Sequence, residues 1–117
     1  MSDDNPTIFG KILRGEIPSD RVWEDEHCIA FRDIHPVAPV HMLVIPRKHI
    51  VNAADIRQDD RALVGHLLWV ASQVAQQAGV DESGYRLVIN CHDNGGQTVP
   101  HLHIHVLGGR GMSWPPG

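Results

Sequence analysis

The chain has 117 residues, 42% of them hydrophobic, which fits one globular domain and argues against general disorder. Ten basic and 14 acidic side chains give a net charge of −4, which disfavours binding of long nucleic acid but allows a single nucleotide. No apolar run approaches the roughly 20 residues that cross a bilayer, and the acidic, polar residues 1–5 lack the features of a secretory signal. We therefore expect a cytoplasmic protein with no membrane partner.

The first half of the chain predicts a short helix, a strand hairpin, a proline-rich loop and a further strand, over residues 7–15, 21–25 with 28–33, 34–39 and 40–45. Thr7 can cap the helix and Gly15 can end it. The run 40–45 is apolar at nearly every position, with His41 as its polar interruption. That pattern predicts a central strand covered on both faces.

The second half predicts a long helix, a strand, a glycine-rich loop, another strand and an extended tail, over residues 59–78, 85–91, 92–98, 101–107 and 114–117. Asp59 or Asp60 can cap the long helix, and Gly79 can end it. Leu68 and Trp69 widen its apolar side beyond one stripe. The wide surface fits either a subunit contact or a helix that lies deep on its own sheet.

About five strands and two helices, without regular strand–helix–strand alternation, predict an α+β fold with a mainly antiparallel five-stranded sheet. The chain shows no repeat and no linker, so we expect a single domain over residues 1–117. Cys28 and Cys91 lie far apart and form no CxxC pair, so two reduced thiols are expected rather than a disulfide.

Residues 101–107 are the most informative segment, because they read His-Leu-His-Ile-His-Val-Leu. The alternation has the period of a β-strand, so His101, His103 and His105 should share one face and the aliphatic residues the other. A row of neutral imidazoles can bind a metal, take an anion or attack an electrophilic centre. A purely structural role is the alternative for each histidine.

The loop before this strand adds possible ligands for an anion. Gly95 and Gly96 allow backbone N–H groups to converge on an anion, and Thr98 adds a hydroxyl, although a Gly-Gly pair is also an ordinary turn. An alternating His-x-His pair can also bind zinc, for which His41 is the best further ligand. Phosphate chemistry and zinc binding are therefore both open at this point.

The segment 101–107 fits the His-φ-His-φ-His-φ-φ signature of the histidine triad (HIT) superfamily, where φ is hydrophobic. The flanks resemble its Hint branch, the histidine triad nucleotide-binding proteins, at residues 8–12, 15–18, 31–34, 39–49, 108–110 and 114–117. They do not resemble the dinucleoside-polyphosphate hydrolase or uridylyltransferase branches. The resemblance covers nearly the whole chain and implies a HIT-like fold whose sheet extends across a homodimer.

The resemblance implies a purine nucleoside phosphoramidase, which cleaves the P–N bond of an AMP- or GMP-linked amine without a cofactor or metal. His103 matches the family nucleophile, which attacks the α-phosphorus and forms a nucleotidyl-histidine that water hydrolyses. His105 matches the residue that binds the α-phosphate. His101 and His41 match the pair that orients the nucleophile and relays its proton. A nucleotide-binding interaction module with incidental turnover and a zinc-binding protein are the alternatives.

The resemblance also implies which residues contact the nucleotide. The apolar base pocket would consist of Ile8, Phe9, Ile12, Phe31 and Ile34. The ribose would contact Asp33 and Asn90, the phosphate or leaving group would contact Thr98, and the glycine-rich loop would contribute Gly96 and Gln97. Trp114 matches a tail residue that reaches toward the neighbouring active site of the homodimer. Val99-Pro100 depart from several relatives, which carry an aromatic residue before the first histidine.

Overall fold

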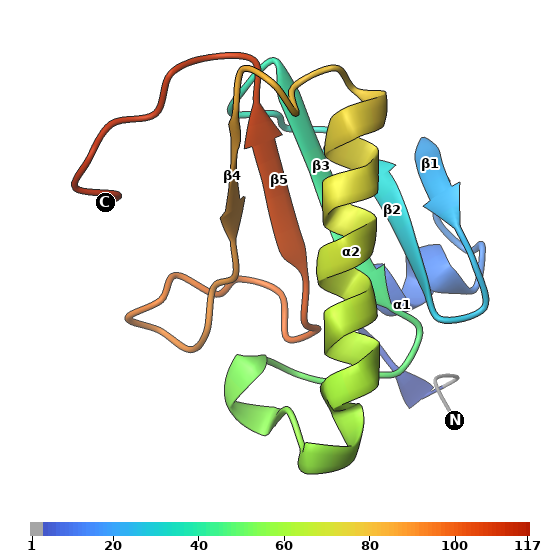
Figure 1. Ribbon diagram of the computed structural model, residues 1–117. Coiled ribbons are helices and arrows are strands. Elements are labelled where there is room, and N and C mark those ends of the chain that lie inside the picture. Colours follow the sequence, from blue (N-terminus) through green and yellow to red (C-terminus); the bar gives the residue numbers. More distant parts are fainter. Residues whose placement is uncertain (1–3) are drawn as a thin grey trace.

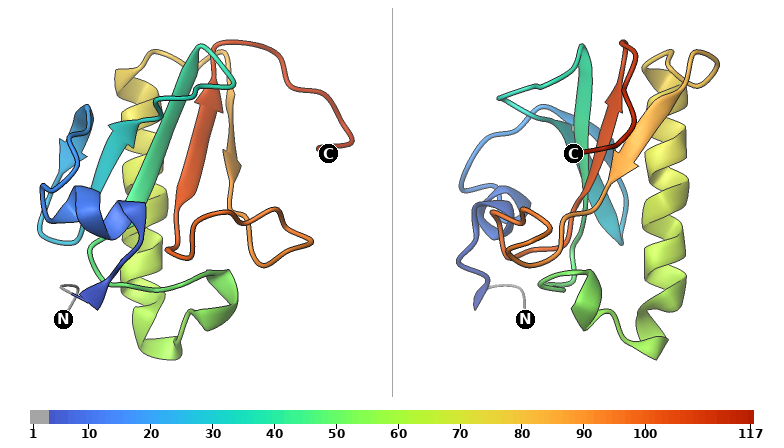
Figure 2. Two further views of the ribbon diagram at one scale, coloured as in Figure 1. Left: turned by 180° about the vertical axis from the view of Figure 1, so that it is seen from behind. Right: turned by 90° about the vertical axis from the view of Figure 1, so that its left-hand side faces the viewer.

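The computed structural model describes residues 4–117 and has one five-stranded antiparallel sheet with two α-helices (Figure 1). The strands are β1 (Arg21–Glu24), β2 (Cys28–Arg32), β3 (Val40–Pro46), β4 (Tyr85–Val88) and β5 (Ile104–Gly108), in the spatial order β1-β2-β3-β5-β4. Helices α1 (Ile8–Leu13) and α2 (Arg61–Gln77) lie on opposite faces of the sheet (Figure 2). Two 3₁₀ turns, η2 (Ala53–Asp55) and η3 (Gln58–Asp60), lead into α2. The predicted fold class is confirmed.

The central strand β3 is buried on both faces, as predicted for the run 40–45. Met42 and Val44 belong to the apolar cluster beneath α2, whereas Leu43 and Ile45 belong to the cluster beneath α1. Because successive strand side chains point to opposite faces, one strand supplies both cores. This two-sided burial fixes the register of β3 against β2 and β5.

Several predicted boundaries differ from the structure. The strand of 85–91 ends at Val88, and the strand of 101–107 begins only at Ile104. The later start follows from the backbone bonds: the N–H of His101 donates to Val99 and that of Leu102 donates to Ile50, so neither joins the sheet there. Pro100, which has no N–H, lies inside the same turn.

The start of α2 also differs from the prediction. Asp60 does not cap the helix with its side chain. Its carboxylate accepts the Arg57 N–H at 2.9 Å and pairs with Lys48, because a 3₁₀ turn precedes the helix. The predicted cap of α1 is correct: the Thr7 hydroxyl accepts the Gly10 N–H at 3.0 Å. Both cysteines are free, as predicted.

The wide apolar surface of α2 is only partly covered. Leu67, Val70 and Val74 are buried against the sheet, but Leu68 and Trp69 stay 43% and 51% exposed. The Trp69 ring packs edge-on against Trp23 of β1, at 5.6 Å between centroids. Within residues 4–117, neither α-helix has the length and apolar character that a membrane-spanning segment needs.

Two glycines in helices give a matched test of the packing around α1. A Cβ on Gly10 would lie 2.5 Å from Asn5, whereas a Cβ on the exposed Gly65 of α2 would meet nothing within 4 Å. We expect Gly10→Ala to lower the free energy of unfolding by roughly 1–3 kcal/mol through overpacking. Gly65→Ala should raise it by about 1 kcal/mol through helix propensity. Urea unfolding of both variants measures the difference, and equal stabilities would contradict the close packing of Asn5 on α1.

Candidate functional site

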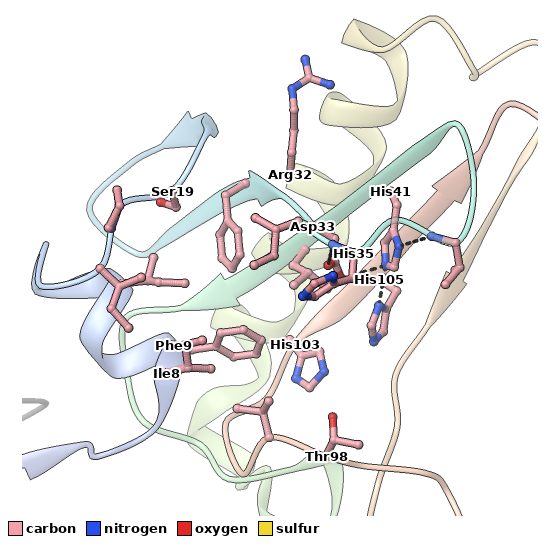
Figure 3. Close-up of a pocket in the computed structure, with 18 residues that line it drawn as sticks. Ile8, Phe9, Ser19, Arg32, Asp33, His35, His41, Thr98, His103 and His105 are labelled. Carbon is pink, nitrogen blue, oxygen red and sulfur yellow. Dashed lines mark hydrogen bonds and ion pairs between the residues drawn. The ribbon is translucent and has the colours of Figure 1, made fainter.

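A pocket of about 480 Å³ opens on the α1 face of the sheet (Figure 3). Helix α1, the end of β2 with the loop that follows it, β3, β5 and the segment before β5 all contribute to its wall. Ten of the sequence-predicted residues line it: Ile8, Phe9, Ile12, Phe31, Asp33, Ile34, His41, Thr98, His103 and His105. These residues come from five separate segments, so the fold brings together side chains that lie far apart in the sequence.

The other predicted site residues do not line this pocket. His101 is fully buried behind it, and Trp114 lies in the tail with 81% of its surface exposed. The Asn90 amide donates to the Gly95 carbonyl at 2.6 Å and so holds the glycine-rich loop. The Gln97 amide donates to the carbonyls of Val51 and Val99.

The glycine-rich loop forms a hydrogen-bonded turn. The N–H of Gly96 donates to Asp93 and that of Gln97 donates to His92, so both donors are used inside the loop. Gly96 has φ +76°, a conformation that glycine tolerates best. Of the two interpretations of this loop, the turn is what the structure shows, and an anion nest would need donors other than these two.

His101 is held by hydrogen bonds that fix its tautomer. The Asn5 side-chain oxygen accepts from the N–H and the hydroxyl of Thr7, so the Asn5 amide nitrogen must face His101. It donates to Nδ1 of His101 at 2.8 Å, while Nε2 of His101 donates to the Pro46 carbonyl at 2.9 Å. Burial lowers the pKa of His101 to about 4, so the ring is neutral at pH 7.

His103 lies above this support and faces the pocket. Its Nδ1 donates to the backbone carbonyl of His101 at 2.7 Å, because a carbonyl can only accept. Burial lowers the pKa of His103, which favours the neutral ring. Nε2 therefore carries a lone pair, and the ring lies between Phe9 and Thr98 in the pocket (Figure 3).

His105 has the opposite hydrogen-bonding character. The N–H of Val37 donates to Nδ1 of His41 at 3.1 Å, so the proton of neutral His41 is on Nε2. That Nε2 donates to Nδ1 of His105 at 2.9 Å, with an Asp33 oxygen 3.3 Å away. His105 then keeps its own proton on Nε2 and can donate it. Burial and the neighbouring imidazoles lower the pKa of His105 to about 4.

The pocket thus places two neutral imidazoles of different function side by side. The ring centroids of His103 and His105 are 5.0 Å apart. One ring offers a nucleophilic lone pair and the other a hydrogen-bond donor, which suits attack on an electrophile that bears an oxygen. The resemblance groups His101 and His41 as a pair around the nucleophile. In the structure they contact different rings, because His101 supports His103 whereas His41 supports His105.

The same histidines include a possible set of metal ligands. One ligand atom each from Asp33, His41 and His105 lie within 4.8 Å of one another. Two imidazoles and a carboxylate form a common donor set for zinc. The zinc alternative raised by the sequence therefore has a specific location. Its ligands would be His41, Asp33 and His105 rather than the three histidines of the alternating segment.

Sequence reasoning missed part of the pocket wall, namely Ile17, Pro18, Ser19, Arg32, His35, Val37, Leu43 and Val99. Leu43 had a usable signal, because it lies two residues after His41 in a predicted strand and so shares its face. No sequence signal indicated Val37, since its role depends on its backbone N–H. The Pro100 carbonyl, next to Val99, accepts from His49 Nε2 at 2.9 Å.

Comparison with known proteins identifies the family of this chain. The family model for the HIT domain matches residues 14–112. The chain belongs to the HIT domain family. A HIT family hydrolase from Legionella pneumophila Philadelphia 1 has a crystal structure with a TM-score of 0.92 and 52% identity, over 94% of this chain and 98% of that one.

Two further relatives carry more specific names. The 14 kDa zinc-binding protein of Zea mays is 51% identical over 98% of this chain and 91% of the maize protein. The crystal structure of a histidine triad nucleotide-binding protein from Candida albicans matches with a TM-score of 0.79 and 31% identity, over 93% of this chain and 82% of that one. The HIT fold is thus shared with proteins of several names.

The burial of these histidines predicts how stability depends on pH. Between pH 6.5 and about 4 the unfolded chain binds a proton on His101, whereas the folded chain does not. The free energy of unfolding should therefore fall as the pH is lowered from 7.5 to 5. His101→Gln should be less stable at pH 7.5 and should show a shallower fall, with His101 contributing at most roughly 2 kcal/mol of the dependence over this range. Urea unfolding across this pH range tests it, and equal pH slopes for the two proteins would contradict the assignment.

Proposed function

We propose that this protein is a purine nucleoside phosphoramidase of the Hint branch, which hydrolyses the P–N bond of AMP- or GMP-linked amines. The observation that carries the proposal is the fixed tautomer of His103, whose Nδ1 donates to a carbonyl and whose Nε2 faces the pocket. An imidazole held in this form is a competent nucleophile at neutral pH. The similarity to a HIT family hydrolase and to a histidine triad nucleotide-binding protein supports this proposal.

The pocket suits the proposed nucleotide in shape and chemistry. Phe9 and Phe31 meet edge to face at 5.8 Å and, with Ile8, Ile12 and Ile34, make an apolar wall for a flat base. Asp33 lies between this apolar wall and the histidines, and one of its oxygens accepts the N–H of His35. Its carboxylate can accept the hydroxyls of a ribose. The predicted ribose contact of Asn90 would require the glycine-rich loop to approach the ligand.

The reaction proceeds by two displacements at phosphorus. Nε2 of His103 forms a bond to the α-phosphorus as the P–N bond breaks, and the nitrogen takes a proton from solvent and leaves as a free amine. Water then attacks the nucleotidyl-histidine, returns one proton to solvent, releases the nucleoside monophosphate and restores the neutral ring. His105 donates from Nε2 to a phosphoryl oxygen, where negative charge increases in the transition state. Asp33 and His41, behind His105, stabilise that donor and provide a path for a proton.

Removing the nucleophile gives a direct test. We expect His103→Ala to lower turnover of an adenosine phosphoramidate by at least about 10³-fold, because the covalent step is lost. Binding of AMP should persist, since the apolar wall and Asp33 remain. Steady-state kinetics, calorimetric AMP titration and a thermal melt separate these effects. Mass spectrometry of quenched wild-type protein should show one added nucleotidyl group on His103.

The same experiment separates the proposal from its rival. Turnover by His103→Ala at a tenth of the wild-type rate would contradict the role of His103. AMP binding without detectable phosphoramidate cleavage by the wild type would favour a nucleotide-binding interaction module.

We also propose that the active protein is a homodimer. Trp114 is 81% exposed in an extended tail, and Leu68 and Trp69 are partly exposed on α2, so aromatic and aliphatic surface is available for a subunit contact. Strand β4 is an edge of the sheet and can pair with a second copy. The Hint resemblance implies that Trp114 then reaches the site of the partner.

The role of the tail can be tested with mixed dimers. Trp114→Ala should raise KM for the phosphoramidate several-fold at an unchanged molecular mass in light scattering. Dimers formed from one His103→Ala chain and one Trp114→Ala chain should have one site lacking both residues and one with neither change. At substrate concentrations well below KM, such dimers should therefore regain about half of the wild-type activity per dimer and exceed both parent homodimers. A monomeric wild type, or mixed dimers no better than the two parents, would contradict this arrangement.

Metal binding in the pocket is the second candidate function. The Asp33, His41 and His105 cluster favours it, and the maize relative is named a zinc-binding protein. A metal there would require Nδ1 of His105 or Nε2 of His41 to give up their mutual hydrogen bond. The phosphoramidase proposal uses these atoms as they stand, which is why we place it first.

A further inference from the structure

A second cluster of potential metal ligands lies on the α2 side of the sheet, away from the pocket. Asp25 belongs to the turn between β1 and β2, Cys28 begins β2, and His66 lies in α2. One ligand atom from each lie within 4.8 Å of one another. The Asp25 Oδ2 atom is 2.7 Å from Nε2 of His66 and 3.7 Å from the sulfur of Cys28.

The turn between β1 and β2 orients the carboxylate toward the other two groups. Oδ1 of Asp25 accepts the backbone N–H groups of His27 at 2.8 Å and Cys28 at 2.9 Å. These two bonds stabilise the turn without any help from α2. Oδ2 is held by the indole N–H of Trp23 at 2.8 Å and points to His66 and Cys28. Hydrogen bonds of this kind commonly fix the orientation of a ligating carboxylate.

We propose that Asp25, Cys28 and His66 form a binding site for a zinc ion. A thiolate, an imidazole and a carboxylate are the three ligand types that zinc uses in proteins. They leave a fourth tetrahedral position for water. The exposed His27 is a further imidazole near the cluster, with its ring centroid 5.3 Å from that of His66. Alkaline-earth ions, which prefer oxygen ligands, do not fit this donor set.

The burial of the cluster suits a bound ion that can still enter from solvent. Cys28 is fully buried within the apolar cluster beneath α2. The side chains of Asp25 and His66 keep about a quarter of their surface exposed, at 25% and 27%. A zinc ion at this point would join the β1–β2 hairpin to α2 across a gap of 41 residues in the sequence. Because it binds the folded chain, it would raise stability in proportion to its affinity and concentration.

Cobalt substitution distinguishes this site from the pocket cluster, because a thiolate ligand gives an intense sulfur-to-cobalt charge-transfer band. We expect the chelator-treated full chain to bind one equivalent of Co²⁺ with that band and to lose it when Zn²⁺ is added. Cys28→Ser should abolish the band, whereas the matched thiol variant Cys91→Ser should retain it. His66→Gln, a change on the partly exposed side of α2, should weaken Co²⁺ binding by more than about tenfold.

Thermal melts provide the second readout. Zinc should raise the melting temperature of the wild type and of Cys91→Ser but not that of His66→Gln, which lacks the imidazole ligand. Absence of the charge-transfer band in the wild type would overturn the proposal. So would its persistence in Cys28→Ser, or Co²⁺ binding that is lost in His105→Asn and unaffected in His66→Gln. Failure here leaves the phosphoramidase proposal intact, because that proposal rests on His103.

Discussion

The hydrogen bond from Nδ1 of His103 to the carbonyl of His101 is the constraint on which the site depends. It fixes the tautomer, and with it the nitrogen that carries the lone pair. The carbonyl can point at His103 because the backbone of 99–103 leaves the sheet in a tight turn before β5 begins. The irregular start of the strand is therefore part of the site, since a regular strand would use that carbonyl in its ladder.

The support for this bond extends to the N-terminal segment. His101 is held by Asn5 on one side and by the carbonyl of Pro46, at the end of β3, on the other. Asn5 also accepts from Thr7, the cap of α1, and packs against Gly10. Helix α1 has only six residues, too few to be stable alone, so these buried contacts hold it in place. The same contacts position Phe9 against both His101 and His103.

The sequence was sufficient for the fold class, the two-faced character of β3 and most of the pocket wall, because these follow from periodicity and from the HIT resemblance. It was not sufficient to predict how deeply each histidine side chain is buried. Period two places His101, His103 and His105 on one face, but whether a ring lines a pocket depends on Asn5, which is 96 residues away from His101. The hydrogen bonding of the glycine-rich loop could not be predicted for a similar reason, since only coordinates show that Gly96 and Gln97 donate within the loop.

Strand β2 explains how one small sheet can carry two separate groups of reactive side chains. Cys28 and Ala30 belong to the cluster beneath α2, whereas Ile29 and Phe31 belong to the cluster beneath α1. Alternation along β2 therefore assigns Cys28 to the Asp25–His66 side and Phe31 to the nucleotide pocket. Groups on opposite faces with no shared partner contribute nearly independently to stability. A ligand on the α2 face would therefore act on the pocket only through the sheet, which is buried on both sides and resists deformation.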